Sequence, residues 1–413
     1  MEVKPGYQQT EVGVIPEEWE VKPLKRLSPS QSVGLVINPS TYFDKAGTVP
    51  LLVGSNVSEN AIDSTTSNRI TMESNEKLPA SRLTAGDLVM VRVGEPGVTA
   101  VVPPELDGCN CASMMIVRQH QSFDSHWLCC MMNSRHGRQQ VEHVQYGTAQ
   151  KQFNISDAVD FLYPVPPLPE QRAIAAALSD VDGLLGGLDR LIAKKRDLKQ
   201  AAMQQLLTGQ TRLPGFHGEW EVKRLGDVAT FFKGKGLPKS ALSESGAEPC
   251  IHYGELFTRY PETIGEIFSR TDNAVGVFRS VANDVLMPTS DVTPRGLAKA
   301  SCIRVDGVIL GGDILVIRSD TNLVHGSFLS LVIRYEETQV LQLVTGSTVY
   351  HLYGSDMKNF TFSIPPLPEQ TAIATVLSEM DGELAVLEQR REKTRALKQA
   401  MMQELLTGRT RLV

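Results

Sequence analysis

Several features that would place this 413-residue chain in a common functional class are missing. No apolar run reaches the roughly 18 residues of a membrane-spanning helix, so the sequence predicts none. The first residues lack the charged and then apolar pattern of a secretory signal. Six cysteines are too few for a disulfide framework in a chain of this length. We therefore expect a cytoplasmic protein that does not enter the membrane and whose cysteines are reduced.

Motifs for catalysis or cofactor binding are also absent. The segment 234–240 resembles a phosphate-binding loop, but it lacks the second glycine before Lys-Ser, and Pro238 removes a backbone N–H that would cradle phosphate. Cys109 and Cys111, with the Cys129-Cys130 pair, lack zinc-ribbon spacing, and we expect buried thiols although His126 lies nearby. The sequence therefore predicts no catalytic residue, no metal site and no cofactor in this chain.

A long internal repeat is the most informative feature that is present. Residues 166–213 match residues 365–412 without a gap, with 30 identities in 48 positions. A second match marks the start of each copy, because the tetrapeptide Trp-Glu-Val-Lys at 19–22 returns at 220–223. The chain therefore consists of two units of one design, each a variable part followed by a nearly constant part.

Within the variable parts only a sparse frame is shared. Asp107-Gly108 parallels Asp306-Gly307, and the run MMIVR that ends at Arg118 parallels ILVIR that ends at Arg318. A fold that is kept while its interior sequence diverges indicates two modules of one shape that recognise different things. Drift after a duplication is the alternative, but it does not explain why the constant part stayed so similar.

The constant part is predicted to be a long helix. Pro169 suits the first turn, where its missing N–H costs nothing, and Glu170 interacts favourably with the helix dipole. Gly209 follows as a C-terminal cap. The second copy repeats this arrangement at Pro368, Glu369 and Gly408. About 40 residues at ~1.5 Å each give a rod of roughly 60 Å.

Apolar residues at alternating steps of four and three predict a coiled-coil seam on each rod. The seam positions are Ile174, Leu178, Val181, Leu185, Leu188 and Ile192 in the first copy and Ile373, Leu377, Met380, Leu384 and Leu387 in the second. A second stripe is expected to widen the apolar face of the first rod at Leu184, Leu191 and Leu198. The seam turns polar, as positions that specify register and partner do, at Lys195, Lys199, Arg391, Thr394 and Lys398. Two rods of equal length favour antiparallel pairing over packing of each rod on its own domain.

The variable parts are rich in short β-type runs broken by Gly, Pro, Asn and Ser, without regular β-α-β alternation. The sequence therefore predicts an α+β chain: two similar mixed α/β domains separated by two long helices that form an antiparallel coiled coil, with a pseudo-two-fold internal repeat. The expected ranges are 1–165 for the first domain, 166–210 for the first helix, 211–364 for the second domain and 365–413 for the second helix.

Polar and basic side chains of the variable parts are candidates for contact with DNA, although the net charge of −6 argues against binding by charge alone. Arg and Lys suit guanine edges and phosphates, and Asn and Gln suit adenine. The candidates of the first part are Asn68, Arg69, Arg92, Arg118, Thr148, Gln150, Lys151 and Gln152. Those of the second part are Lys233, Lys235, His252, Tyr253, Arg259, Arg295, Ser347, Tyr350 and His351. The loops around Gly147 and Gly346 rank highest because they occupy equivalent positions beside the rods; a solvated surface is the alternative for any single residue.

The whole chain resembles the specificity (S) subunit of a type I restriction–modification enzyme. The resemblance rests on the segment TEVGVIPEEWEVK from Thr10 and the segment FNISDAVDF from Phe153. It also rests on the PPLPEQ segment that begins each constant part and the LLTG-x-TRL segment that ends it. One PPLPEQ would be a weak signal, but two, each after a variable part and before a long heptad helix, are specific. The family has no short motif that fixes base-reading residues.

The resemblance implies that each variable part is a target-recognition domain for one half of a bipartite target in double-stranded DNA. It implies that the paired helices set the spacer and dock two modification subunits, adenine-N6 methyltransferases that use S-adenosylmethionine. Restriction subunits would supply ATP- and Mg-dependent translocation and cleavage, and the S subunit itself would be non-catalytic in host defence against foreign DNA. A coiled-coil scaffold that presents two protein-binding domains is the alternative. A single-chain nuclease–methyltransferase would need an Asn-Pro-Pro-Tyr motif, which the sequence lacks.

Overall fold

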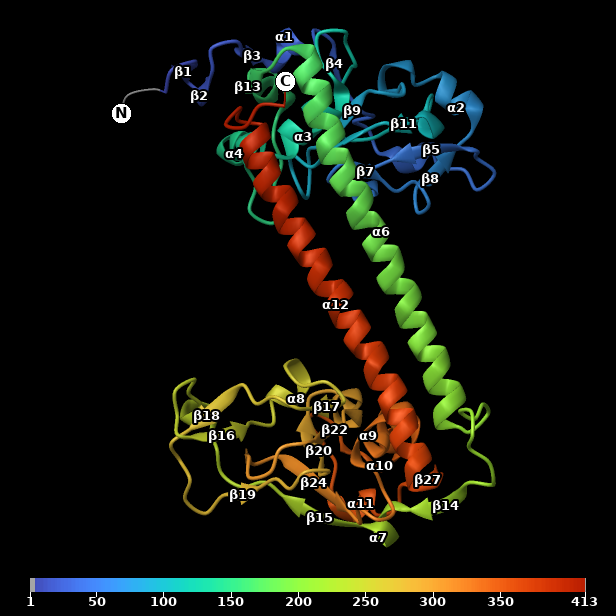
Figure 1. Ribbon diagram of the computed structural model, residues 1–413. Coiled ribbons are helices and arrows are strands. Elements are labelled where there is room, and N and C mark those ends of the chain that lie inside the picture. The colour runs from blue at the N-terminus through green and yellow to red at the C-terminus, as the bar shows by residue number, and fades with distance from the viewer. Residues whose placement is uncertain (1–3, 413) are drawn as a thin grey trace. The chain divides into compact units, whose positions relative to one another are not determined.

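The structure is a computed structural model that describes residues 4–412, so residues 1–3 and 413 of the predicted domain ranges lie outside the described residues. Contacts divide the chain into unit 1, residues 1–189 with 390–413, and unit 2, residues 190–389 (Figure 1). Each unit combines one mixed α/β domain with a part of each long helix. The end of the chain thus belongs with the first domain.

Unit 1 is built on two sheets with the strand orders β10-β9-β12-β4 and β11-β5-β8. The strands of the first sheet are β4 (Gln31–Val33), β9 (Leu88–Val91), β10 (Thr99–Val101) and β12 (Met114–Val117). Those of the second sheet are β5 (Val49–Leu52), β8 (Asn68–Ile70) and β11 (Asn110–Cys111). Side chains alternate along a strand, so Leu88 and Met90 of β9 enter a core with helix α3 (Ser125–Asn133), whereas Val89 and Val91 enter a core with β5.

Shorter elements complete the first domain. The remaining strands are β1 (Tyr7–Thr10), β2 (Gly13–Pro16), β3 (Glu20–Pro23), β6 (Val57–Ser58), β7 (Ala61–Ile62) and β13 (Leu162–Val165). The remaining short helices are α1 (Leu24–Leu27), α2 (Met72–Glu76), α4 (Arg135–Val144) and α5 (Ile155–Ala158). Strand β3, which contains most of the repeated Trp-Glu-Val-Lys segment, pairs antiparallel with β13 directly before the long helix begins.

Unit 2 repeats this strand order and adds one strand to each sheet, β17 to the main sheet and β19 to the second. Its main sheet has the order β15-β24-β20-β22-β17, and its second sheet has the order β18-β16-β23-β19. These strands are β15 (Ala229–Lys233), β16 (Glu248–Ile251), β17 (Thr263–Ile264), β18 (Ser269–Thr271), β19 (Phe278–Arg279), β20 (Val285–Pro288), β22 (Ser301–Ile303), β23 (Ile309–Leu310) and β24 (Ile314–Ser319). The helices are α7 (Leu225–Val228), α8 (Glu255–Thr258), α9 (Gly326–Tyr335), α10 (Glu337–Leu343) and α11 (Gly354–Met357). Strands β14 (Glu221–Arg224) and β27 (Thr361–Ile364) pair as β3 and β13 do. The predicted α+β class with two similar domains is confirmed.

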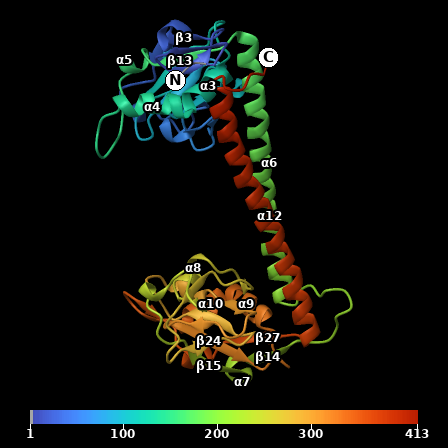
Figure 2. The same cartoon turned by 60° about the vertical axis from the view of Figure 1, so that its left-hand side comes forward.

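The constant parts form the two predicted helices, α6 (Leu168–Leu207) and α12 (Leu367–Leu405). Within unit 1, Lys398 Nζ lies 2.5 Å from Asp182 Oδ1, and Arg391 Nη1 lies 3.3 Å from Asp189 Oδ1. As numbers rise along one helix they fall along the other, so the segments run antiparallel, side by side in Figures 1 and 2.

The same pairing occurs in unit 2. Lys199 Nζ contacts Asp381 Oδ1 at 2.5 Å, and Lys195 Nζ contacts Glu383 Oε2 at 2.5 Å. The Lys199–Asp381 pair is the repeat counterpart of the Lys398–Asp182 pair of unit 1. Four of the five polar seam positions, Lys195, Lys199, Arg391 and Lys398, therefore pair with the other helix, whereas Thr394 donates to the Arg390 carbonyl of its own helix.

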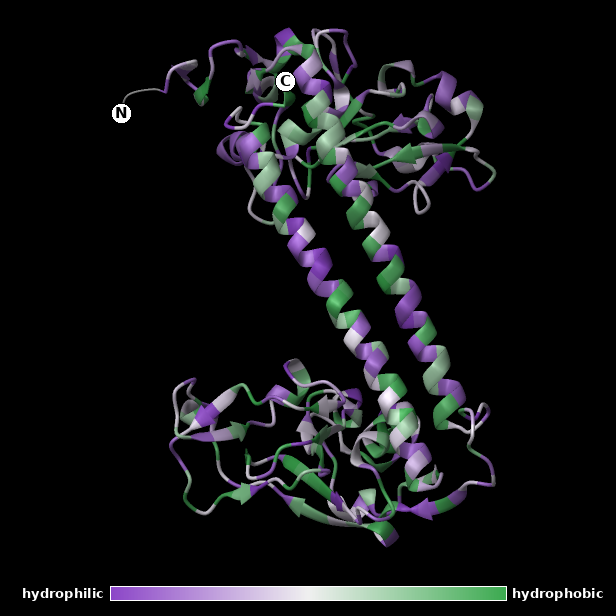
Figure 3. Cartoon of the chain, viewed as in Figure 1, coloured by the Kyte–Doolittle hydropathy of each residue, from purple (hydrophilic) through white to green (hydrophobic). Residues whose placement is uncertain are grey.

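The second apolar stripe does not widen the buried face. Leu184, Leu191 and Leu198 are 46 %, 40 % and 49 % exposed, whereas the seam residues Leu188 and Ile192 are buried. A pair of helices covers only the narrow seam that faces the partner, so a side chain one position away remains in water. Hydrophilic and hydrophobic residues accordingly alternate along both helices (Figure 3).

The first turn of α6 carries a buried carboxylate. Glu170 is fully buried; its Oε2 accepts a hydrogen bond from Trp19 Nε1 at 2.9 Å, and its Oε1 lies 2.5 Å from Arg411 Nε. Hydrogen bonds to Glu170 and Glu18 raise the pKa of Arg411, which therefore stays charged. Gln171 beside it accepts from the backbone of Asp124, the residue that caps α3. The repeated PPLPEQ and TRL segments thus meet each other in space.

Unit 2 contains the same pair of a buried glutamate and an arginine. Glu369 is buried, and its two carboxylate oxygens lie 2.5 and 2.6 Å from Arg212 Nε and Nη2. Here Trp220 stacks on Arg212, with the guanidinium 5.6 Å from the ring centroid. The Trp220 Nε1 has no hydrogen-bond partner among residues 4–412. The glutamate–arginine pair is thus repeated, but Trp19 donates a hydrogen bond to the glutamate, whereas Trp220 stacks on the arginine.

Three negative findings apply to residues 4–412. No helix there is both long and apolar enough to cross a bilayer. No three His, Cys, Asp or Glu side chains gather where they would hold a metal ion. All six cysteines are buried free thiols, and burial raises the pKa of Cys302 to about 11.

The Arg411–Glu170 contact gives a stability prediction. We expect Arg411→Ala to lower the free energy of unfolding of unit 1 by about 3 kcal/mol. The substitution leaves the buried carboxylate of Glu170 with Trp19 as its only partner. Hydrogen exchange read by mass spectrometry should locate the loss in unit 1. Arg409→Ala, which removes an exposed pair with Glu404, should change the value by less than about 0.5 kcal/mol. Equal effects of the two variants would contradict the prediction.

Candidate nucleic-acid interface

Each domain presents an exposed hairpin next to the main sheet. In unit 1, Tyr146 and Gln152 exchange two backbone hydrogen bonds of 2.9 Å, and Gln152 also bridges to Val93. Gly147 begins the turn at φ +96°, and a Cβ there would lie 2.3 Å from the Gln150 carbonyl oxygen, so the turn requires glycine. Residues 147–151 are all exposed and form the tip.

Unit 2 has the same hairpin. Strand β25 (Thr345–Gly346) pairs with β26 (Tyr350–His351), which also pairs with β21 (Ser290–Asp291). Gly346 has φ +114°, and a Cβ there would lie 2.2 Å from the Val349 carbonyl oxygen. Ser347, Thr348 and Val349 are exposed at the tip. The two tips share their turn geometry but differ in the side chains that they present.

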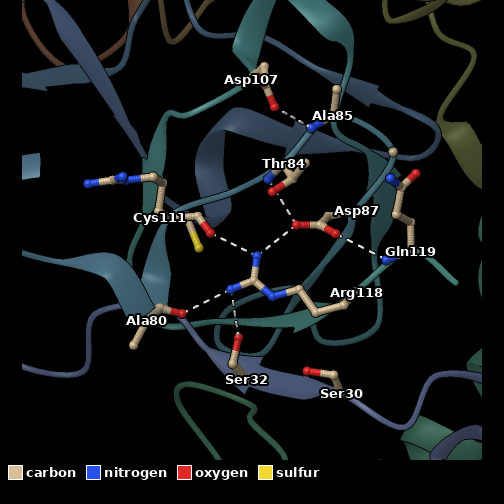
Figure 4. Close-up of polar contacts among 12 residues, drawn as sticks. Ser30, Ser32, Ala80, Thr84, Ala85, Asp87, Asp107, Cys111, Arg118 and Gln119 are labelled. Carbon is tan, nitrogen blue, oxygen red and sulfur yellow. Dashed lines mark hydrogen bonds and ion pairs between the residues drawn. The ribbon is translucent and has the colours of Figure 1, made fainter. Parts of the chain in front are cut away.

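The side chains of the frame residues that the two domains share form hydrogen bonds and ion pairs within their own domain. Arg118 Nη1 donates to Asp87 Oδ2 at 2.7 Å and to the Arg82 carbonyl at 2.8 Å, and its Nη2 donates to Ser32 and Ala80 (Figure 4). Arg118 was a candidate for contact with bases, but the structure gives its guanidinium an internal role. Figure 4 also shows the Asp107 carboxylate on the Ala85 backbone N–H, at 2.8 Å.

The counterparts in unit 2 make the corresponding bonds to an aspartate and to a backbone N–H. Arg318 binds both carboxylate oxygens of Asp284, at 2.8 and 2.7 Å, and Asp306 accepts from the Ala282 N–H at 2.7 Å. The Arg318 guanidinium also lies 5.1 Å from the centroid of the Phe232 ring. The shared residues therefore build the scaffold, and what differs between the domains is presented on it.

The other candidates of unit 1 lie apart from the hairpin tip or beside it. Asn68 and Arg69 are exposed on β8, where Arg69 donates to the Thr48 carbonyl at 2.8 Å. Arg92 follows β9 and donates to the Phe153 carbonyl at 3.3 Å, directly beyond Gln152. Arg92 thus lies at the base of the hairpin, whereas the β8 pair belongs to the second sheet.

In unit 2 the structure brings most candidates to two hollows. Lys233 and His351 line the first, of about 810 Å³, together with Phe232, Tyr353 and Lys358. His252, Tyr253 and Arg259 line the second, of about 630 Å³, together with Lys239 and the carboxylates Glu244 and Glu255. Sequence reasoning missed Tyr353, Lys239 and Lys358; the only available signal was their nearness in sequence to named candidates.

Several of these side chains already have partners. Lys233 pairs with Asp313 at 3.1 Å, Arg259 with Glu255 at 3.5 Å, and Arg295 with Glu337 at 2.9 Å. His252 stacks on Tyr253 with the centroids 4.6 Å apart. Burial is the main cause that lowers the pKa of His252, and the nearby Glu255 acts against it.

Comparison with known proteins agrees with this architecture. Residues 217–395 match the family described as type I restriction modification DNA specificity domain. The chain is 25 % identical over 431 aligned residues to a protein named as the MjaX type I restriction enzyme specificity subunit of Methanocaldococcus jannaschii, covering 98 % of this chain and 97 % of that protein.

Solved structures share the fold. The S subunit of a type I restriction–modification system from M. genitalium has a TM-score of 0.61 at 12 % identity, with 98 % of both chains covered. A structure from work on assembly and conformational transition of a type I system has a TM-score of 0.58 at 19 % identity, with 96 % of this chain and 99 % of that chain covered. The family match over residues 217–395, the full-length relative and the doubled fold agree in one respect: the chain is similar to type I restriction–modification specificity subunits over nearly its whole length.

Proposed function

We propose that this chain recognises a bipartite DNA sequence for a type I restriction–modification complex, with one domain for each half of the target, and that it is not itself catalytic. The observation that carries the proposal is the pair of equivalent hairpins with unlike tips. Glycines with positive φ shape both turns, and each hairpin pairs with the segment that follows the central strand, at Val93 in unit 1 and at β21 in unit 2. Exchange of tip residues therefore changes what is read without a change of fold.

Base contacts are assigned first to the tips. In the first domain Thr148, Gln150 and Lys151 are exposed and carry the donors and acceptors that major-groove edges require. In the second domain Ser347 and Tyr350 are the repeat counterparts of Thr148 and Lys151. His351, the counterpart of Gln152, is half-buried beside Tyr350 on β26. The remaining candidates, Asn68, Arg69, Arg92, Gln152, Lys233, Lys235, His252, Tyr253, Arg259 and Arg295, are proposed to position the duplex or to read flanking bases.

Partner subunits supply the chemistry in this proposal. Two adenine-N6 methyltransferase subunits dock on the helices and bind S-adenosylmethionine, and restriction subunits use ATP and Mg²⁺, in the cytoplasm. Exposed apolar residues on the helices support docking: Leu198 is 49 % exposed in unit 2, and its repeat counterpart Leu397 is 56 % exposed in unit 1. Two equivalent patches fit two copies of one partner.

The helices are further proposed to set the spacer between the half-sites. Each helix is uninterrupted over about 40 residues and links one domain to the other. Ion pairs at half-buried seam positions hold the register of the two helices. A rod of fixed length and register is what a constant spacer requires.

Removing the side chains of the first tip should change one half of the target. We expect Thr148→Ala/Gln150→Ala/Lys151→Ala to weaken discrimination against wrong bases in the first half-site by about 1–3 kcal/mol for each bidentate base contact that is lost. Discrimination in the second half-site should be unchanged. The measurement is the methylated motif of a host that carries the complete system. Arg118→Lys is the matched control, since it weakens the internal bonds of the same domain and should leave the motif intact. A change in the second half would refute the assignment.

Lengthening the rods should lengthen the spacer. From the Asp182–Lys398 and Asp189–Arg391 pairs, Gly187 lies opposite Lys393, so four residues inserted at both points lengthen both helices together. Roughly 6 Å of added rise should widen the spacer by about one to two base pairs, because base pairs stack ~3.4 Å apart. Four residues keep the seam nearly in phase, whereas two rotate it and mainly destabilise the pair. An active variant with the original spacer would show that the helices do not set it.

A further inference from the structure

The loop after β15 in unit 2 carries an unusual charge. Residues 229–243 contain three lysines, Lys233, Lys235 and Lys239, and no acidic residue. Lys233 is neutralised in part by Asp313, 3.1 Å away. Lys235 and Lys239 are exposed and make no ion pair with any residue from 4 to 412. Two free cations therefore stand on one short loop.

The loop is held rigidly by the fold. The N–H groups of Gly234 and Lys235 donate to the carbonyls of Ile314 and Leu310 at 2.9 and 3.0 Å, and the Gly236 carbonyl accepts from the Gly312 N–H at 2.8 Å. Leu237, at φ +63°, is buried against Cys250 and Ile309. The lysines are thus presented from a fixed base and not from a mobile segment.

The surroundings extend the cationic surface across the domain. On one side the first hollow, which His351 also lines, adds Lys358 beside Lys233. On the other side the second hollow adds Arg259, which pairs with Glu255, beside Lys239. The acidic groups that face these hollows are Asp313, Glu244 and Glu255; Glu255 is held by the Ser269 hydroxyl at 2.6 Å and by the His252 N–H at 2.9 Å. The hairpin that presents His351 therefore borders the lysine loop.

The equivalent loop of unit 1 shares two backbone hydrogen bonds with the lysine loop and has none of its charge. The Gly34 and Leu35 N–H groups donate to Met114 and Cys111 carbonyls at 2.8 Å, as Gly234 and Lys235 do to their counterparts. Residues 34–43 contain no charged side chain, and Val36 and Ile37 are 68 % and 53 % exposed. The two units therefore differ in electrostatics at one equivalent place.

We propose that the loop 233–239 is a clamp for the phosphate backbone of duplex DNA, which positions the second domain without reading sequence, and that the equivalent loop of unit 1 makes no such contact. This inference rests on the proposed function. Lysine is suited to phosphate as a compact charge, and contacts with phosphate set position and not sequence. Unit 2 then supplies more of the salt-dependent binding than unit 1.

The test is the salt dependence of binding by the full chain in complex with its modification subunit. Each phosphate neutralised contributes about −0.9 to the slope of log K against log salt concentration, so Lys235→Gln/Lys239→Gln should reduce its magnitude by about 1.8, and each single variant by about half of that. Fluorescence anisotropy on a duplex with the methylated motif gives the slope. The motif itself should be unchanged in both halves.

Two controls separate charge from folding. Lys235→Arg/Lys239→Arg keeps the charge and should keep the slope, and Lys223→Gln removes a lysine that pairs with Glu221 at 2.6 Å and should also leave it unchanged. An unaltered slope in the double Gln variant overturns the proposal, as does a changed second half-site, which would show that the loop reads bases. Loss of the modification subunit with the DNA slope intact would assign the loop to a protein contact and also overturn it. If the wild-type complex recognises no bipartite sequence, the proposed function fails instead.

Discussion

The buried carboxylates at the start of the two long helices are the constraint on which the architecture depends. An unpaired carboxylate costs several kcal/mol to bury, so Glu170 and Glu369 each require an arginine in place. Arg411 lies 241 residues from Glu170 in sequence, and Arg212 lies 157 residues from Glu369. Each arginine follows the end of the other long helix, so each domain is completed by a segment that follows its partner's rod. This requirement brings the end of the chain to the first domain and fixes where antiparallel helices begin and end.

Much of this plan could be predicted from the sequence because it repeats. The helix bounds follow from Pro169 and Gly209 and their copies, and the seam follows from the spacing of residues such as Leu188 and Ile192. The role of Glu170 was only partly visible: the sequence indicated a favourable charge at a helix start, whereas the structure shows a buried acceptor for Arg411 and Trp19. Periodicity reports which face is apolar, but it does not report which distant side chain completes a charge.

The remaining differences have the same origin. Leu184 matches a heptad stripe, yet it is exposed, because only the geometry of the partner decides how wide the covered face is. Arg118 has the chemistry of a base reader, yet Asp87 and two carbonyls occupy its guanidinium. Residue type predicts what a side chain is able to bind, and only the fold decides whether its donors are free.

The two copies within one chain separate scaffold from reader. Residues that are identical in both units, such as Asp107 and Asp306, form hydrogen bonds with the backbone of their own domain. Residues that differ, at the hairpin tips and on the loops after β4 and β15, leave their polar atoms exposed to water. Mutation of the shared Arg118 or Arg318 leaves a buried aspartate without its ion pair and costs stability, whereas mutation at the exposed positions that differ costs little. Under the proposed function, a chain built in this way changes its target through substitutions only where the fold does not depend on them. A net negative charge is no obstacle when exposed cations such as Lys235 and Lys239 stand on a rigid loop.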